Sequence, residues 1–164
     1  MNRVALAELR ERLHKRKPVS AQIDTAHLCP RRARSAMIVL DASAAVDWLL
    51  QPSPGQKEKR ISRNETLPAP NLLDLEVAQV LPRLVLQGVV SVHRAGEVVT
   101  DLLDLRTTRY PHLVLLPRIW RLRHNFPAYD AAYIVLAETL GTALVTRDAR
   151  LASASGHTAG IELF

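Results

Sequence analysis

The sequence predicts an α/β fold, namely a three-layer α/β/α sandwich with a central parallel sheet of four to five strands. Short apolar runs alternate with longer segments of helical periodicity, which is typical of a parallel sheet covered by helices on both faces. A chain of 164 residues, of which 48% are hydrophobic, can bury one sizeable core. Because no internal repeat divides the chain, we expect one folded domain.

The charge divides the chain into two unequal parts. Residues 1–36 contain nine Lys/Arg and three Asp/Glu, so they carry the whole net charge of +6. Residues 37–164 contain thirteen of each kind and are neutral. Pro18 and Pro30 interrupt any long helix before residue 37. We therefore predict a basic, flexible N-terminal extension over 1–36, which either contacts phosphate or an acidic partner or is a solvated tail.

The predicted elements of residues 37–164 follow one another without a second domain. Strands are expected over the apolar runs at 37–41, 113–117, 142–146 and 161–164. Helices are expected over 43–50, about 71–87, about 92–106, 118–125, 128–140 and 148–154. The polar, proline-rich segment 51–70 is predicted to be a loop with room for one helical turn. Gly141 is predicted to end the helix before it, and Pro82 to kink the helix that contains it.

Two aspartates stand where predicted strands end. Asp41 ends the first strand, and Asp148 comes two residues after the end of the strand over 142–146. In open parallel sheets, ligands collect at the carboxyl ends of the strands. Each aspartate could equally cap the helix that follows, because Asp is a favoured N-cap residue. Ser43 and Thr146, beside them, either cap a helix or support a ligand.

Two further carboxylates fall on helix faces that should be apolar. Glu76 lies four residues after Leu72 and four before Val80, which places it in the predicted apolar stripe. An unpaired charge is costly there. Asp130 shares a face with Tyr133 and further apolar residues, although it could also be a cap or an acid favoured by the helix dipole.

These four carboxylates have one common explanation, which is a hard divalent cation such as Mg²⁺ or Mn²⁺. Oxygen ligands suit such ions, and a cation relieves the repulsion between neighbouring carboxylates. A site of this kind suits phosphoryl chemistry, so the sequence points to phosphodiester hydrolysis. Asp74, two residues before Glu76, is interpreted as an acid of the first helical turn outside the site. Cys29, the only cysteine, excludes an internal disulfide, and no zinc-binding spacing is present.

Four motifs in order resemble the VapC toxins of the PIN-domain family. They are DASAAVDWLL, LLDLEVAQVL, RLRHNFPAYDAAYIVLAETLG and ALVTRDARLA, and together they span nearly all of residues 37–164. The stretches YDAAYIVLAE and TRDARLA are the most specific. The resemblance implies that Asp41, Glu76, Asp130 and Asp148 form the acidic catalytic and metal-binding site. Thr146 matches the threonine that usually precedes the last aspartate.

The resemblance also implies an activity and partners. It implies a magnesium- or manganese-dependent endoribonuclease that hydrolyses tRNA or ribosomal RNA to inhibit translation, as the toxin of a type II toxin–antitoxin system. It further implies a homodimer neutralised by a VapB-type antitoxin. The alternative is a PIN fold that acts as an antitoxin-bound regulatory partner with little nuclease activity. Because all four acids are present, we favour the nuclease.

Several basic and aromatic residues have weaker assignments. Arg121, Arg123 and Arg147 could guide an RNA backbone toward the acids, although solvated surface arginines are an equal alternative. The aromatic residues Trp48, Trp120 and Tyr133 are interpreted as packing groups rather than base-stacking platforms.

Other classes of protein lack their key residues here. A dinucleotide-binding domain requires GxGxxG after the first strand, and DASAAV has no glycine. A receiver domain requires a lysine near its phosphorylated aspartate, yet the last lysine is Lys59. No apolar run approaches the roughly 18 residues of a membrane span, and the N-terminus lacks a secretory signal, so we expect a cytoplasmic protein.

Overall fold

The computed structural model describes residues 37–51 and 67–164; the predicted extension over 1–36 and residues 52–66 of the predicted loop lie outside them. Five strands are present in the described part: β1 (Ile38–Leu40), β2 (Leu67–Pro70), β3 (Thr107–Tyr110), β4 (Ala143–Thr146) and β5 (Ile161–Leu163). Parallel pairs join β1 to β4, β4 to β5 and β2 to β3, and β2 lies beside β1. The predicted α/β class with a parallel sheet is confirmed.

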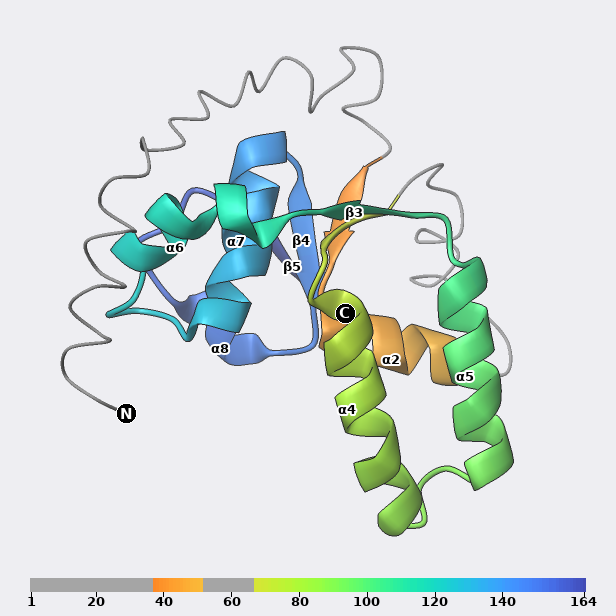
Figure 1. The fold of residues 1–164 in the computed structure, drawn as a ribbon. Coiled ribbons are helices and arrows are strands. Elements are labelled where there is room, and N and C mark those ends of the chain that lie inside the picture. The colour runs from red at the N-terminus through yellow and green to blue at the C-terminus, as the bar shows by residue number, and fades with distance from the viewer. Residues whose placement is uncertain (1–36, 52–66) are drawn as a thin grey trace, which may run out of the picture.

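Helices lie on both sides of this sheet (Figure 1). They are α2 (Ala42–Leu50), α4 (Leu73–Leu86), α5 (Val92–Asp104), α6 (Leu116–Arg121), α7 (Ala128–Leu140) and α8 (Ala149–Ser153), with a short 3-10 helix, η1 (His112–Val114). Figure 1 shows α6 and α7 on one side of the sheet and α2, α4 and α5 on the other. Helix α7 packs on β1, β2 and β4, which explains its almost uniformly apolar sequence. Its end at Gly141, which adopts a left-handed conformation with φ of 62°, is as predicted.

The predicted strand over 113–117 is wrong. Residues His112–Val114 form η1, and Leu116 begins α6. Pro117 lies in the first turn of α6, where a missing backbone N–H leaves no helical hydrogen bond unmade. A short apolar run fits a buried helix as well as a buried strand, and periodicity cannot separate the two.

Two strands were absent from the prediction. Strand β2, with the sequence LPAP, lies in the segment predicted as a loop, and its four residues are buried. It pairs in parallel with β3, where Leu67 is opposite Thr107 and Pro70 opposite Tyr110. Strand β3 is polar (TTRY) because only one neighbouring strand covers it, so its sequence lacks the apolar pattern of a central strand.

The connections place several helix N-termini at one edge of the sheet. Helices α2, α4 and α8 directly follow the carboxyl ends of β1, β2 and β4. Helix α7 leads into β4, so its own N-terminus returns to this same edge. Among the helices of residues 37–51 and 67–164, none is both long and apolar enough to cross a membrane.

Candidate metal centre at the carboxyl edge of the sheet

Asp41 occupies the N-cap position of α2 without capping it through its side chain. Its Oδ2 atom instead accepts hydrogen bonds from Ser43 Oγ at 2.6 Å and from Thr146 Oγ1 at 2.7 Å. The residue as a whole is only 9% exposed. Of the two interpretations open for Asp41, the structure therefore disfavours capping. Two hydroxyls fix its carboxylate at the end of β1.

The hydroxyls of Ser43 and Thr146 also join the loop after β4 to this carboxylate. Thr146 is completely buried, and its Oγ1 accepts a hydrogen bond from the backbone N–H of Asp148 at 3.0 Å. Ser43 Oγ accepts one from the backbone N–H of Arg147 at 3.1 Å. The two hydroxyls therefore tie the carboxylate of Asp41 to the backbone that follows β4.

Asp148 caps a helix, as one of its two interpretations proposed. Its Oδ1 accepts a hydrogen bond from the backbone N–H of Arg150 at 2.8 Å, at the start of α8. The guanidinium of Arg150 also binds the carboxylate, with Nη2 at 2.6 Å from Oδ2. Hydrogen bonding to Arg150 holds the pKa of Asp148 below its ordinary value. The positive charge of Arg150 therefore already lies against the carboxylate of Asp148.

Glu76 lies in the first turn of α4, at the margin of the buried face rather than within it. The buried residues of α4 are Leu73, Val77 and Leu81, one position away from the stripe that the sequence predicted. That correction leaves Glu76 half-buried. Its Oε2 accepts a hydrogen bond of 2.5 Å from the hydroxyl of Tyr133 on α7. Tyr133 is buried, as expected of a packing group, but the hydrogen bond was not foreseen.

Asp130 lies in the first turn of α7 and belongs to the same group of charges. Burial raises its pKa, and the nearby carboxylates of Asp41 and Asp148 raise it further. Burial likewise raises the pKa of Glu76, with added repulsion from Asp41 and Asp130, while the Tyr133 hydrogen bond lowers it. The four predicted acids are thus electrostatically coupled at one edge of the sheet.

The four carboxylates do not form a complete set of metal ligands in this structure. Within the described ranges, no group of three or more His, Cys, Asp or Glu side chains lies close enough together to hold an ion. Asp41 and Asp148 are turned toward hydroxyls and Arg150. The donor set still fits a hard divalent cation, because its atoms are carboxylate oxygens and their mutual repulsion is what a cation relieves. A bound cation would have to draw these carboxylates closer together than they lie in this structure.

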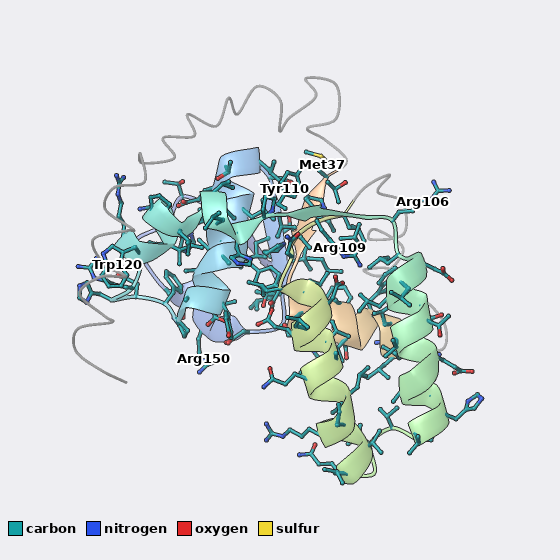
Figure 2. The ribbon with its side chains drawn as sticks, in the orientation of Figure 1. Met37, Arg106, Arg109, Tyr110, Trp120 and Arg150 are labelled. Carbon is teal, nitrogen blue, oxygen red and sulfur yellow. The ribbon has the colours of Figure 1, made fainter. Side chains whose placement is uncertain are left out.

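The three arginines predicted to guide RNA have different environments. Arg147 donates a hydrogen bond of 2.5 Å to Asp47 on α2. Arg121 is exposed in the last turn of α6. Arg123 lies over the ring of Trp120, 4.8 Å from its centroid. Trp120 is 68% exposed, so its assignment as a packing group is wrong. Figure 2 shows it projecting outward at α6.

Sequence reasoning missed two partners of the acids. Arg150 follows Asp148 by two residues, and the helix cap folds its side chain back onto the carboxylate. Tyr133 follows Asp130 by three residues on α7, and this spacing predicted that the two residues share a helix face. The spacing could not predict the contact of Tyr133 with Glu76, because Glu76 lies on another helix. Asp74 lies outside the acidic group, as predicted, and two hydrogen bonds of 2.7 and 2.8 Å join it to Arg109 on β3.

The family model of the PIN domain matches residues 38–156, and the chain belongs to this family. Over 127 residues, the chain is 42% identical to "Ribonuclease VapC12" of Mycobacterium tuberculosis, which covers 77% of this chain and 98% of the relative. It is 44% identical over 115 residues to "Ribonuclease VapC9" of the same organism, covering 70% of this chain and 88% of the relative. The resemblance to the VapC proteins is therefore confirmed.

A solved structure has the same architecture. The crystal structure of PAE2754 from Pyrobaculum aerophilum superposes with a TM-score of 0.59 at 25% sequence identity. The match covers 80% of this chain and 87% of that one. The sheet and its flanking helices are thus those of a PIN fold.

Proposed function

We propose that the chain is an endoribonuclease of the VapC type, the toxin of a type II toxin–antitoxin pair, and that it depends on Mg²⁺ or Mn²⁺. The observation that carries the activity is the similarity over most of the chain to proteins named as VapC ribonucleases. The alternative, a regulatory partner with little nuclease activity, is not favoured because the named relatives are ribonucleases.

The residues proposed to hold the ion are Asp41, Glu76, Asp130 and Asp148. A divalent cation supplies polarisation of the phosphate, stabilisation of the leaving oxygen and a lowered pKa for an attacking water. The support for this assignment is the coupling of the four carboxylates. Because the pKa values of Glu76 and Asp130 are raised, we expect these two groups to release protons when a cation binds.

The remaining roles belong to orienting and positioning groups. Ser43 and Thr146 hold the carboxylate of Asp41 in one orientation. The N-termini of α4 and α7 lie at the acidic edge and favour an anionic phosphate there. Arg121, Arg123 and Arg147 are proposed to contact the RNA backbone. They position RNA without reading its sequence.

Two partners complete the proposal. A VapB-type antitoxin is expected to neutralise the protein by covering the site, and the protein itself is expected to form a homodimer. Exposed apolar side chains outside the acidic group, including Leu113 at 70% and Trp120 at 68% exposure, support an interface with another protein chain. Light scattering on the purified protein, alone and with the antitoxin, measures both assemblies.

Cleavage of total cellular RNA by the full-length protein tests the activity. The reaction is run with Mg²⁺ or Mn²⁺, beside samples with EDTA and samples of Asp130→Asn. Discrete fragments that disappear in both controls would support a metal-dependent ribonuclease and reveal the cleaved RNA. Intact RNA in every lane, with Mn²⁺ binding shown by calorimetry, would contradict the nuclease and return the choice to the regulatory partner.

A further inference from the structure

A cavity of about 320 Å³ opens directly beside Glu76. It lies between α4 and α7, with η1 and α6 along its side, and we call it the α4–α7 pocket. Its wall includes Glu76, Gln79, His112, Leu116, Tyr129 and Ala132. Most of its surface is apolar. Among the described residues of the wall, Glu76 and His112 are the titratable ones besides Tyr129. The volume is at the small end of the roughly 300–1,000 Å³ found for ligand pockets.

Two of the four acids lie on the same two helices as the pocket. The first turn of α4 carries Glu76, and the first turn of α7 carries Asp130. Tyr129, next to Asp130 in sequence, lies on the pocket wall. A polynucleotide that places a phosphate at the acids therefore has an adjacent nucleotide beside the pocket. The pocket is continuous with the proposed active site through Glu76.

The side chains of the pocket match the chemistry of a nucleobase better than that of a phosphate. A phosphate favours several cationic donors, whereas Glu76 on the wall is an acid and most of the other wall residues are apolar. A base requires apolar or aromatic surfaces for its faces and amide or imidazole groups for its edge. Tyr129 is 63% exposed, so its ring is available for stacking, and Gln79 and His112 are exposed polar groups on the same wall.

We propose that the α4–α7 pocket binds one nucleobase of the RNA, adjacent to the phosphate at the acidic edge, and so gives the enzyme a base preference. The proposal rests on the ribonuclease function proposed above. Tyr129 stacks on the base, Gln79 and His112 contact its edge, and Ala132 forms the apolar floor. A side chain of an antitoxin is the competing occupant of this pocket.

The test compares the affinities of the full-length protein for three single-stranded RNA octamers: oligo(A), oligo(C) and oligo(U). Fluorescence anisotropy is measured with Ca²⁺ in place of Mg²⁺, because Ca²⁺ takes the same carboxylate ligands. A gel of each sample confirms that the RNA stays intact. All three RNAs have the same phosphates, and the ratio of their dissociation constants therefore reports the bases alone. Stacking in a pocket predicts a ratio of at least about fivefold between the best and worst RNA.

Variants then assign the preference to the pocket. Ala128→Phe fills it from the exposed first residue of α7, and Tyr129→Ala removes the stacking ring. Both are expected to bring the ratio close to one, whereas Tyr129→Phe retains it. Leu103→Ala is the matched control, because Leu103 is also an exposed apolar residue but lies on α5, across the sheet.

Each outcome decides between the occupants. Equal affinities for the three RNAs, or a ratio that persists in Ala128→Phe, would overturn the proposal. Unchanged base ratios combined with lost antitoxin binding in Ala128→Phe would also overturn it, and would assign the pocket to a protein side chain. A pocket-dependent ratio in a protein that cleaves no RNA would support the pocket and contradict the proposed nuclease. The two proposals can therefore fail separately.

Discussion

Tyr133 on α7 donates a hydrogen bond from its hydroxyl to Oε2 of Glu76 on α4, across 2.5 Å. The two residues are 57 positions apart in sequence and meet only because α4 and α7 converge at the carboxyl edge of the sheet. Burial raises the pKa of Glu76, and this hydrogen bond lowers it. Tyr133 therefore keeps Glu76 closer to the ionised form that a cation requires.

Replacing Tyr133 tests this relationship. In Tyr133→Phe the pKa of Glu76 should rise, because the hydrogen bond to the ionised form is lost while burial remains. Proton competition for the carboxylate then weakens Mn²⁺ binding, so the acid limb of the affinity profile moves to higher pH. Calorimetric titrations with Mn²⁺ between about pH 5 and 8 measure this shift of the affinity profile. Tyr129→Phe is the matched control, and an equal shift in that variant would contradict the assignment.

The two hydroxyl groups that donate hydrogen bonds to Asp41 should contribute unequally to stability. Thr146→Val preserves shape but leaves the buried carboxylate without one donor, which should cost about 1–3 kcal/mol of the free energy of unfolding. Ser43 is exposed, and water can replace its hydroxyl, so Ser43→Ala should cost about 1 kcal/mol or less. Chemical denaturation measures both values. A larger loss in Ser43→Ala would show that Thr146 is not the main support.

The acidic group makes the stability of the metal-free protein dependent on pH. The pKa values of Glu76 and Asp130 are raised above their ordinary values, so their contribution is fully present below the ordinary carboxyl pKa. It is lost as pH rises through the raised values, because ionisation then places charge in a partly buried site and brings repelling charges together. Glu76→Gln and Asp130→Asn should remove this loss.

Thermal unfolding in EDTA, compared between wild type and each variant across the pH range, measures the effect. Subtracting the profile of each variant from that of the wild type cancels the opposite contribution of Glu138, whose pKa is lowered by Arg118. Added Mg²⁺ should raise the unfolding temperature of the wild type at neutral pH by more than it raises that of either variant. Parallel profiles in EDTA would contradict coupling among the acids.

Arg150 should compete with a cation for Asp148. In Arg150→Gln the pKa of Asp148 rises toward its ordinary value, because its main stabilising partner is gone. Mn²⁺ should nevertheless bind more tightly at neutral pH, by no more than a few-fold, since an exposed ion pair is a weak competitor. Arg123→Gln is the control, because Arg123 faces Trp120 instead. Weaker Mn²⁺ binding in Arg150→Gln would contradict the competition.

The pair formed by Asp74 and Arg109 should serve stability alone. Arg109→Gln removes a partly exposed double hydrogen bond between β3 and α4, at a cost of about 1 kcal/mol or less. RNA cleavage and Mn²⁺ affinity should be unchanged in Asp74→Asn, in contrast to Glu76→Gln on the same helix. Lost cleavage in Asp74→Asn would place this acid in the site.

Much of the architecture was readable from local pattern. The alternation of strands and helices, the end of α7 at Gly141 and the acids after β1 and β4 all follow from side-chain periodicity and chain order. Periodicity is local because it depends only on which face a residue presents within one element. Parallel connectivity then places strand ends at one edge, and this predicted the neighbourhood of Asp41 and Asp148.

Contacts between distant segments decided the rest. Strand β2 exists because β1 and β3 lie beside it, although its own sequence, LPAP, is typical of a loop. The bond between Tyr133 and Glu76 and the α4–α7 pocket depend on how two helices approach. Whether Asp41 caps a helix or faces hydroxyls depends on Thr146, 105 residues later. No local pattern encodes such distances, because they arise only when the core packs.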